Sequence, residues 1–105
     1  MKSENPKIRK FENQNARRFV VFGRVQGVGF RWFVENEASK LGISGWVRNR
    51  EDGCVEVLAA GTKAQLDSLY DVLLRGPRAA RVDRVEVEEA VPTSDLKSFR
   101  IEGTS

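Results

Sequence analysis

At 105 residues the chain is long enough for one modest domain and too short for two. It is 40% hydrophobic and 31% charged, a balance typical of soluble proteins, and no apolar stretch approaches the roughly 18 residues that would cross a membrane. The net charge of +3 does not indicate a nucleic-acid binder, because the first 18 residues carry +4 and the other 87 carry −1.

The N-terminal segment, residues 1–16, is polar and charged, contains Pro6 and shows no sustained hydrophobic periodicity. We expect a flexible charged leader here, followed by a folded domain over residues 17–105. That domain opens with RRFVVFGRV (17–25), whose valines and phenylalanines are typical of a half-buried β-strand. Glycines then interrupt regular structure, and residues 26–29 are predicted to form a tight loop.

Residues 30–42 have the pattern of an amphipathic helix. Their apolar side chains recur at spacings of three and four, and Gly42 is expected to end the helix as its C-terminal cap. A short strand is predicted next, over residues 43–49. The Asp-Gly pair within residues 50–53 is typical of a hairpin turn, so we expect the chain to return as a second strand over residues 54–60.

The second predicted helix has a recognisable start. Thr62 and Gln65 match a capping box, in which the hydroxyl and the amide each satisfy a free backbone N–H. Residues 66–74 then place four leucines and a tyrosine at i, i+3, i+4, i+7 and i+8, which indicates one apolar helix face. Gly76 and Pro77 are expected to end this helix.

The last elements complete the fold prediction. Valines and glutamates alternate over residues 81–90, which indicates a strand, and after a loop over residues 92–97 a short closing edge strand is predicted over residues 99–102. The order strand–helix–strand–strand–helix–strand is that of the ferredoxin-like split βαβ arrangement, an α+β fold. We expect an antiparallel sheet of four to five strands with two helices on one face. Since this fold hosts many activities, function must be argued from a site.

The residue types that are missing restrict the chemistry. The chain has no histidine and a single cysteine, Cys54, which excludes Ser–His and Cys–His couples and thiolate metal clusters and removes the usual general base. No metal site is predicted. Cys54 cannot form an internal disulfide, which fits a cytoplasmic location, and we interpret it as a small buried strand residue. A catalyst built from this chain must bind an anion and position water.

The segment VQGVGFR (25–31) suits anion binding. Its glycines let backbone N–H groups approach one anion, and the start of the following helix adds a favourable dipole. Arg31, in the first helical turn, offers a planar guanidinium to two phosphate oxygens. The nucleotide-binding patterns GxGxxG and GxxxxGK[ST] are absent. The alternative is a plain connector with an exposed arginine, and spacing alone leaves both interpretations open.

A second candidate is Asn49, at the end of the strand predicted over residues 43–49. Its carboxamide can donate and accept hydrogen bonds, so it can orient a water molecule without changing charge. The split βαβ arrangement can bring this strand end back beside the glycine-rich loop. The alternative is that Asn49 only opens the turn at residues 50–53, and the local pattern alone favours this alternative.

Two segments resemble the signatures of the acylphosphatase family. They are VFGRVQGVGFR (21–31) and GWVRNREDGCVEVLAAG (45–61), and the resemblance extends from about Arg17 to Gly103. It implies a ferredoxin-like fold and hydrolysis of acyl phosphates to carboxylate and inorganic phosphate, without metal or cofactor. Trp32 stands where a tyrosine is commoner in the family, a change expected to have no effect.

The resemblance also implies roles for individual residues. Arg31 falls on the family's phosphate-binding arginine, and Asn49 on the asparagine that places the attacking water. No protein base is evident, so our hypothesis is that the bound phosphate accepts the proton of this water. The loop falls on the main-chain cradle for phosphate, formed by Gln26, Gly27, Val28, Gly29, Phe30 and Arg31.

Other functions remain as alternatives at this point. One is a nucleic-acid-binding or protein-binding module on the same fold, although the aromatic strand signature of RNA-binding versions is absent. Another is a regulatory or carrier domain like those inside larger maturation enzymes, but a single domain favours a free enzyme. We therefore expect a monomer whose partners are a small acyl phosphate and inorganic phosphate, with no nucleic acid and no membrane.

Overall fold

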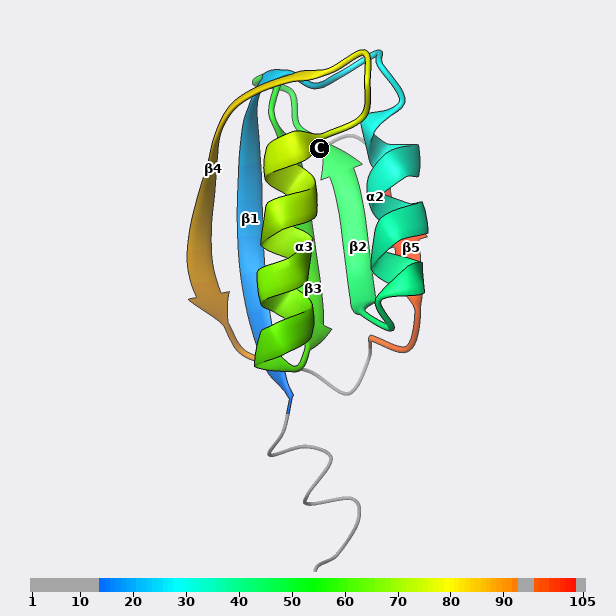
Figure 1. The fold of residues 1–105 in the computed structure, drawn as a ribbon, viewed down its shortest axis with the longest axis vertical. Helices are drawn as coiled ribbons and strands as arrows, with labels where there is room; N and C mark the ends of the chain where they lie inside the picture. Colours follow the sequence, from blue (N-terminus) through cyan, green and yellow to red (C-terminus); the bar gives the residue numbers. More distant parts are fainter. Residues whose placement is uncertain (1–13, 93–95, 104–105) are drawn as a thin grey trace, which may run out of the picture.

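The computed structural model describes residues 14–92 and 96–103. In these residues a five-stranded sheet carries two helices on one face (Figure 1). Both predicted helices and all five predicted strands are therefore confirmed, to within two residues at each end. In chain order the elements are β1 (Asn15–Arg24), α2 (Phe30–Lys40), β2 (Ser44–Asn49), β3 (Val55–Gly61), α3 (Lys63–Arg75), β4 (Arg81–Ala90) and β5 (Phe99–Ile101).

The strand order across the sheet is β4-β1-β3-β2-β5. The pairs β1–β3, β1–β4 and β2–β3 are antiparallel, as the ferredoxin-like prediction requires. The prediction of a wholly antiparallel sheet is wrong at one edge, because β5 pairs parallel with β2. Since β4 and β5 lie on opposite edges, they form no hairpin that would fix β5 as antiparallel. The sheet is therefore mixed.

The first strand begins earlier than predicted. β1 starts at Asn15, so the predicted boundary of the leader at residue 16 is wrong by two residues. Ala16 is fully buried and pairs with Ala60 on one side and Ala90 on the other, which extends the strand beyond its apolar run. The rest of the predicted leader, residues 1–13, lies outside the described residues.

The core lies between the helices and one face of the sheet. Alternate strand residues point toward the helices, and each helix contributes residues three or four positions apart, as the two periodicities predict. Cys54 is buried at the entrance to β3, as expected. None of the helices in the described part of the chain is long and apolar enough to cross a membrane. The central residues of the core include Phe19, Val21, Val55, Val57, Phe30, Val34, Leu66, Leu69 and Leu73.

The predicted helix ends are also confirmed. At the start of α3, the Thr62 hydroxyl accepts a hydrogen bond from the Gln65 N–H at 3.1 Å, and the Gln65 amide oxygen accepts one from the Thr62 N–H at 2.8 Å. α2 ends at Lys40, and Gly42 lies just beyond it with φ of 79°. These local sequence signals therefore set where the helices begin and end.

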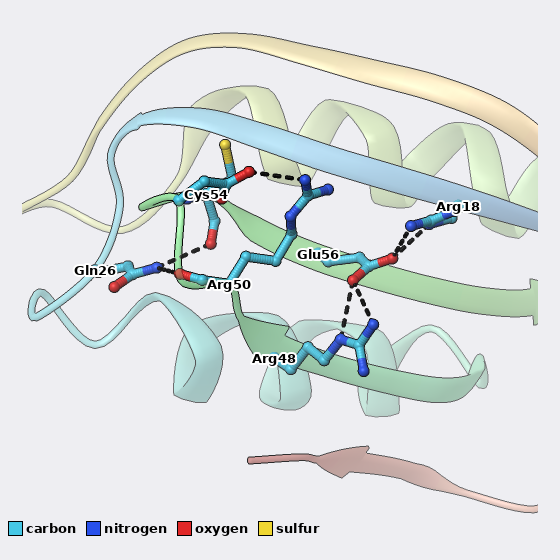
Figure 2. A network of polar contacts seen from close by, with 7 residues as sticks. Arg18, Gln26, Arg48, Arg50, Cys54 and Glu56 are labelled. Carbon is cyan, nitrogen blue, oxygen red and sulfur yellow. Dashed lines mark hydrogen bonds and ion pairs between the residues drawn. The ribbon is translucent and has the colours of Figure 1, made fainter. Parts of the chain in front are cut away.

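In the described part of the chain, the opposite face of the sheet carries no helix, and charged side chains interact across it. Glu56 of the central strand β3 is only 2% exposed, and it pairs with Arg18 of β1 and Arg48 of β2 (Figure 2). The Arg48 guanidinium also lies 4.6 Å from the centre of the Trp46 ring. Two guanidinium groups thus neutralise a buried carboxylate and connect three neighbouring strands.

Candidate active site

A pocket of about 220 Å³ lies where β2 and β5 end and α2 begins. In Figure 1 this is the end of the sheet at which the cyan loop after β1 enters α2. Arg31 and Asn49, which the sequence places in separate motifs, both line this pocket. The fold therefore brings the two predicted site residues together. The full lining is Val25, Gly27, Gly29, Phe30, Arg31, Trp32, Asn49 and Ile101.

The loop before α2 presents its main chain to the pocket. Gly27 and Gly29 have φ of 73° and 79°, a left-handed conformation that side chains disfavour. A Cβ atom at either position would meet nothing within 4 Å, so it is the backbone conformation, rather than crowding, that favours glycine. Gly29 caps α2 without any side-chain hydrogen bond.

Within the described residues, the N–H groups of this loop and of the start of α2 make no backbone hydrogen bonds. Phe33 donates the first backbone hydrogen bond of α2, to the Gly29 carbonyl at 3.0 Å. Among residues 14–92 and 96–103, no backbone carbonyl accepts a hydrogen bond from the N–H groups of residues 26–32. These donors lie at the positive end of the helix dipole, where an anion is stabilised.

Arg31 is half-buried in the first turn of α2 and lines the pocket. No described carboxylate lies within ion-pair distance of its guanidinium, whereas Arg18, Arg48 and Arg50 all have acidic partners. The sequence left open whether Arg31 was merely exposed on a connector. Its position in the pocket, without an acidic partner in the described chain, leaves the guanidinium available to an anionic ligand.

Asn49 is the last residue of β2 and lies two residues beyond the buried Val47, on the helix-facing side of the sheet. The turn that follows is closed by other groups, because the Arg50 N–H donates to the Cys54 carbonyl at 2.9 Å and the Cys54 N–H donates to the Asp52 carboxylate at 3.0 Å. The latter bond holds the pKa of Asp52 below its ordinary value. Within the turn itself, the side chain that accepts a backbone hydrogen bond is thus that of Asp52.

The side chain of Gln26 bonds to a distant turn instead of lining the pocket. Its side-chain amide donates to the carbonyls of Arg50 and Cys54, at 2.7 and 2.9 Å, so it reaches across to the turn after Asn49 (Figure 2). Gln26 is therefore absent from the pocket lining, and Val28 packs against the core instead. The sequence predicted Gln26 only as a main-chain donor, and nothing in its local pattern indicates this bridge.

Neighbouring polar groups do not enter the pocket. Arg48 is held by Glu56 on the other face of the sheet (Figure 2), and Arg50 pairs with Asp52 at 2.7 Å. Burial raises the pKa of the Cys54 thiol, which keeps it neutral. Within the described residues, no three His, Cys, Asp or Glu side chains gather where they would hold a metal ion. The polar lining of the pocket thus consists of main-chain groups, Arg31 and Asn49.

Two lining residues, Trp32 and Ile101, were not predicted as part of a site. Trp32 follows Arg31 in the sequence, and this adjacency was the only available signal. Ile101 belongs to the edge strand β5, whose position beside β2 depends on the whole sheet. The Ile101 side chain and the ring faces of Trp32 are apolar, so the pocket joins a cationic region to a largely hydrophobic one.

Comparisons with known proteins cover most of the chain. A family model for acylphosphatase matches residues 17–101. The chain is 64% identical over 93 residues to an acylphosphatase of Koribacter versatilis (strain Ellin345), an alignment that covers 89% of this chain and 84% of the relative. The crystal structure of acylphosphatase from Bacillus subtilis matches with a TM-score of 0.80 and 41% identity, over 84% of this chain and 98% of that one.

A larger protein contains a similar unit. The crystal structure of full-length HypF in the phosphate- and nucleotide-bound form matches with a TM-score of 0.80 and 32% identity. The match covers 87% of this chain but only 12% of that one. The same fold is thus found both over nearly the full length of the Bacillus protein and as a small part of a longer chain.

Proposed function

The chain belongs to the acylphosphatase family, and on that premise we propose that it hydrolyses acyl phosphates in the pocket lined by Arg31 and Asn49. As a member of this family it is a hydrolase acting on acid anhydrides, with a carboxylate and inorganic phosphate as products. One observation supports this location above all others. A cation without a described acidic partner and a neutral carboxamide line one pocket at the open start of α2.

The proposed phosphate site consists of the loop N–H groups and Arg31. Phosphate carries its charge on several oxygens, so it can accept hydrogen bonds from main-chain donors and from two nitrogens of a guanidinium at once. The N–H groups of residues 26–30 supply donors and the start of α2 supplies a favourable dipole. This assignment would place the positive charge that the reaction needs on the protein itself, which is why we propose a reaction without metal.

The proposed role of Asn49 is to orient the attacking water. Its carboxamide oxygen can accept a hydrogen bond from the water, and its nitrogen can donate one to the phosphate. Because the group is neutral, its orientation does not depend on pH in the range where the protein is folded. The end of a strand is a rigid position, and rigidity matters because misplaced water would lose the in-line geometry.

The proposed step needs no strong acid. The water oxygen forms a bond to phosphorus while the bond from phosphorus to the acyl oxygen breaks, and the carboxylate leaves with the electron pair. Such a leaving group permits a loose transition state, in which the main task is to stabilise charge on the equatorial oxygens. No acidic side chain lines the pocket in the described chain, so we propose that a phosphoryl oxygen accepts the proton of the water.

Phosphate release from acetyl phosphate and benzoyl phosphate, measured with and without a chelator, tests this proposal. We expect turnover of both compounds and no loss with the chelator. Asn49→Ala should lower kcat while leaving competitive inhibition by inorganic phosphate nearly intact. Absence of turnover would contradict the proposed function. Loss of turnover on addition of the chelator would contradict a reaction without metal. Loss of phosphate inhibition together with turnover in Asn49→Ala would point to a structural role for this residue.

The quaternary and cellular statements are also proposals. We propose a monomer that acts in the cytoplasm, without a nucleic-acid or membrane partner; the single buried Cys54 supports a reducing compartment. The HypF likeness favours one alternative, a domain that serves a larger enzyme. Light scattering of the purified chain tests the monomer. Binding of acyl phosphate without release of phosphate would favour the alternative.

A further inference from the structure

The pocket has an exposed apolar rim, which we define as Trp32 and Ile101. Both residues line the pocket, and they are 74% and 36% exposed. Large exposed apolar side chains cost free energy in water, and where two of them meet at one concave site they indicate contact with a ligand. The proposed phosphate chemistry uses neither side chain, so the rim is left to be explained.

The rim lies directly beside the reacting groups. Trp32 follows Arg31 in the first turn of α2, and Ile101 pairs with Val47 across the parallel β2–β5 ladder. Asn49 lies two residues beyond Val47, so Ile101 and Asn49 are on the same face of the sheet, about one pleat repeat apart. The pocket therefore has a polar half around Arg31 and Asn49 and an apolar half at the rim.

We propose that the rim binds the acyl group of the substrate, and that the chain prefers acyl phosphates whose acyl group is aromatic or a long aliphatic chain. The inference rests on the proposed function, because it needs the phosphoryl group bound beside Arg31. In the described chain the pocket lining contains one charged side chain, Arg31, one carboxamide, Asn49, and one indole N–H donor, that of Trp32; no carboxylate or hydroxyl lines it. Arg31 and Asn49 are assigned to phosphate and water, so beyond the indole N–H of Trp32 no lining side chain remains to pair with a charged acyl group or to accept a hydrogen bond from a polar one.

The chemistry of the rim favours flat apolar groups. An aromatic acyl group can stack on the indole of Trp32 and remove apolar surface of both partners from water. The acetyl group of acetyl phosphate is too small to cover both rim residues. Since the contact is remote from the breaking bond, it stabilises the bound substrate and the transition state equally, and its loss raises KM rather than lowering kcat.

Trp32→Ala and Ile101→Ala test the rim, with Val91→Ala as the control. Val91 is 80% exposed but lies outside the pocket, so it matches Trp32 in exposure. We expect Trp32→Ala to raise KM for benzoyl phosphate about tenfold and KM for acetyl phosphate less than twofold, with a smaller effect in the same direction for Ile101→Ala. Trp32→Tyr keeps an aromatic face and should retain most of the preference.

Inhibition by unreactive phosphonates gives a readout that does not depend on turnover. Benzylphosphonate should inhibit wild type more strongly than methylphosphonate, and Trp32→Ala should reduce this difference while Val91→Ala preserves it. Two results would overturn the proposed acyl site and leave the proposed function standing. One is an equal rise in KM for benzoyl phosphate and acetyl phosphate in Trp32→Ala, and the other is equal inhibition of wild type by the two phosphonates. Failure of wild type to hydrolyse any acyl phosphate would instead overturn the proposed function, and the acyl site with it.

Discussion

The two helices begin in opposite ways. At the start of α3, Thr62 and Gln65 each satisfy a backbone N–H of the other, so the first turn is closed by its own side chains. At the start of α2, Gly29 provides no side chain, and the N–H groups of residues 26–32 find no backbone acceptor in the described chain. Both helices pack on the same face of the sheet, so the side on which they pack does not account for the difference between their first turns.

The comparison separates a stabilising helix start from a binding one. A glycine N-cap such as Gly29 typically costs a few tenths of a kcal/mol relative to a Ser or Thr cap, so α2 gives up a little of the stability that α3 keeps. In return its donors stay available to a ligand at the positive end of the helix. Arg31 follows at once and adds a full charge to that end. A helix start without a side-chain cap is thus a place to look for function in this fold.

The two glutamines repeat the contrast. Gln65 completes the capping box and also donates to the Leu41 carbonyl at 2.8 Å, so it supports helix α3 and its neighbour. Gln26 instead reaches from the glycine loop to the carbonyls of Arg50 and Cys54. One glutamine fixes a helix end, and the other fixes the distance between the loop and the turn after Asn49.

The largest expected effect follows removal of the charge at the open start of α2. Arg31→Ala should lower kcat/KM for benzoyl phosphate by about 10²–10³ or more and weaken inhibition by inorganic phosphate, because charge stabilisation and binding are both lost. Arg75→Ala, an exposed arginine in the last turn of α3, is the matched control and should leave both unchanged. Undiminished turnover by Arg31→Ala contradicts its assignment.

An intermediate effect is expected when the bridge from the loop is cut. Gln26→Leu keeps the size of the side chain but cannot donate to either carbonyl, so the loop and Asn49 lose their fixed separation and kcat should fall about tenfold. Gln65→Leu is the control. Each of the two variants loses partly buried hydrogen bonds and should lower the free energy of unfolding by about 1–3 kcal/mol, but Gln65→Leu should leave kcat unchanged. Thermal melts and kinetics of both variants provide the check; equal activity losses would mean that only stability was affected.

The smallest effect on activity is expected at the closed helix start. Thr62→Ala removes one half of the capping box and should lower the free energy of unfolding by about 1 kcal/mol, as measured in urea. Steady-state kinetics with acetyl phosphate should match those of wild type, because the start of α3 does not line the pocket. A loss of turnover in this folded variant would contradict the proposal that the start of α3 only stabilises the fold while the start of α2 binds the substrate.

Much of the fold could be predicted because its signals are local. The capping box, the spacing of leucines over residues 66–74 and the Asp-Gly turn each act within a few residues. The structure confirms the box, the turn and the helix face at Leu66, Leu69 and Leu73. The prediction is wrong for Leu74, which is exposed, while Val72 is buried. The glycine-rich loop and the helix after it were likewise predicted in place. The direction of β5 was not, because it depends on which edge of the finished sheet is open.

The parts of the site that were missed depend on contacts between distant segments. The Gln26 side chain finds its partners 24 and 28 residues away, and the burial of Glu56 depends on Arg18, 38 residues away. Trp32 looks like an ordinary exposed helix position until Ile101 is placed beside the same pocket. Residue type and spacing could predict Arg31 and Asn49 as candidates, but only the fold supplies their neighbours.

Titration of the ¹⁵N-labelled protein with inorganic phosphate, followed by amide chemical shifts, tests the central claim most directly. We expect saturable shifts concentrated in the N–H groups of residues 26–32 and in the side-chain amide of Asn49. The N–H groups of residues 62–65 should stay unchanged, and Arg31→Ala should abolish the response. Saturable shifts at the start of α3, or on the outer face around Glu56, with none in the glycine loop, would contradict the account.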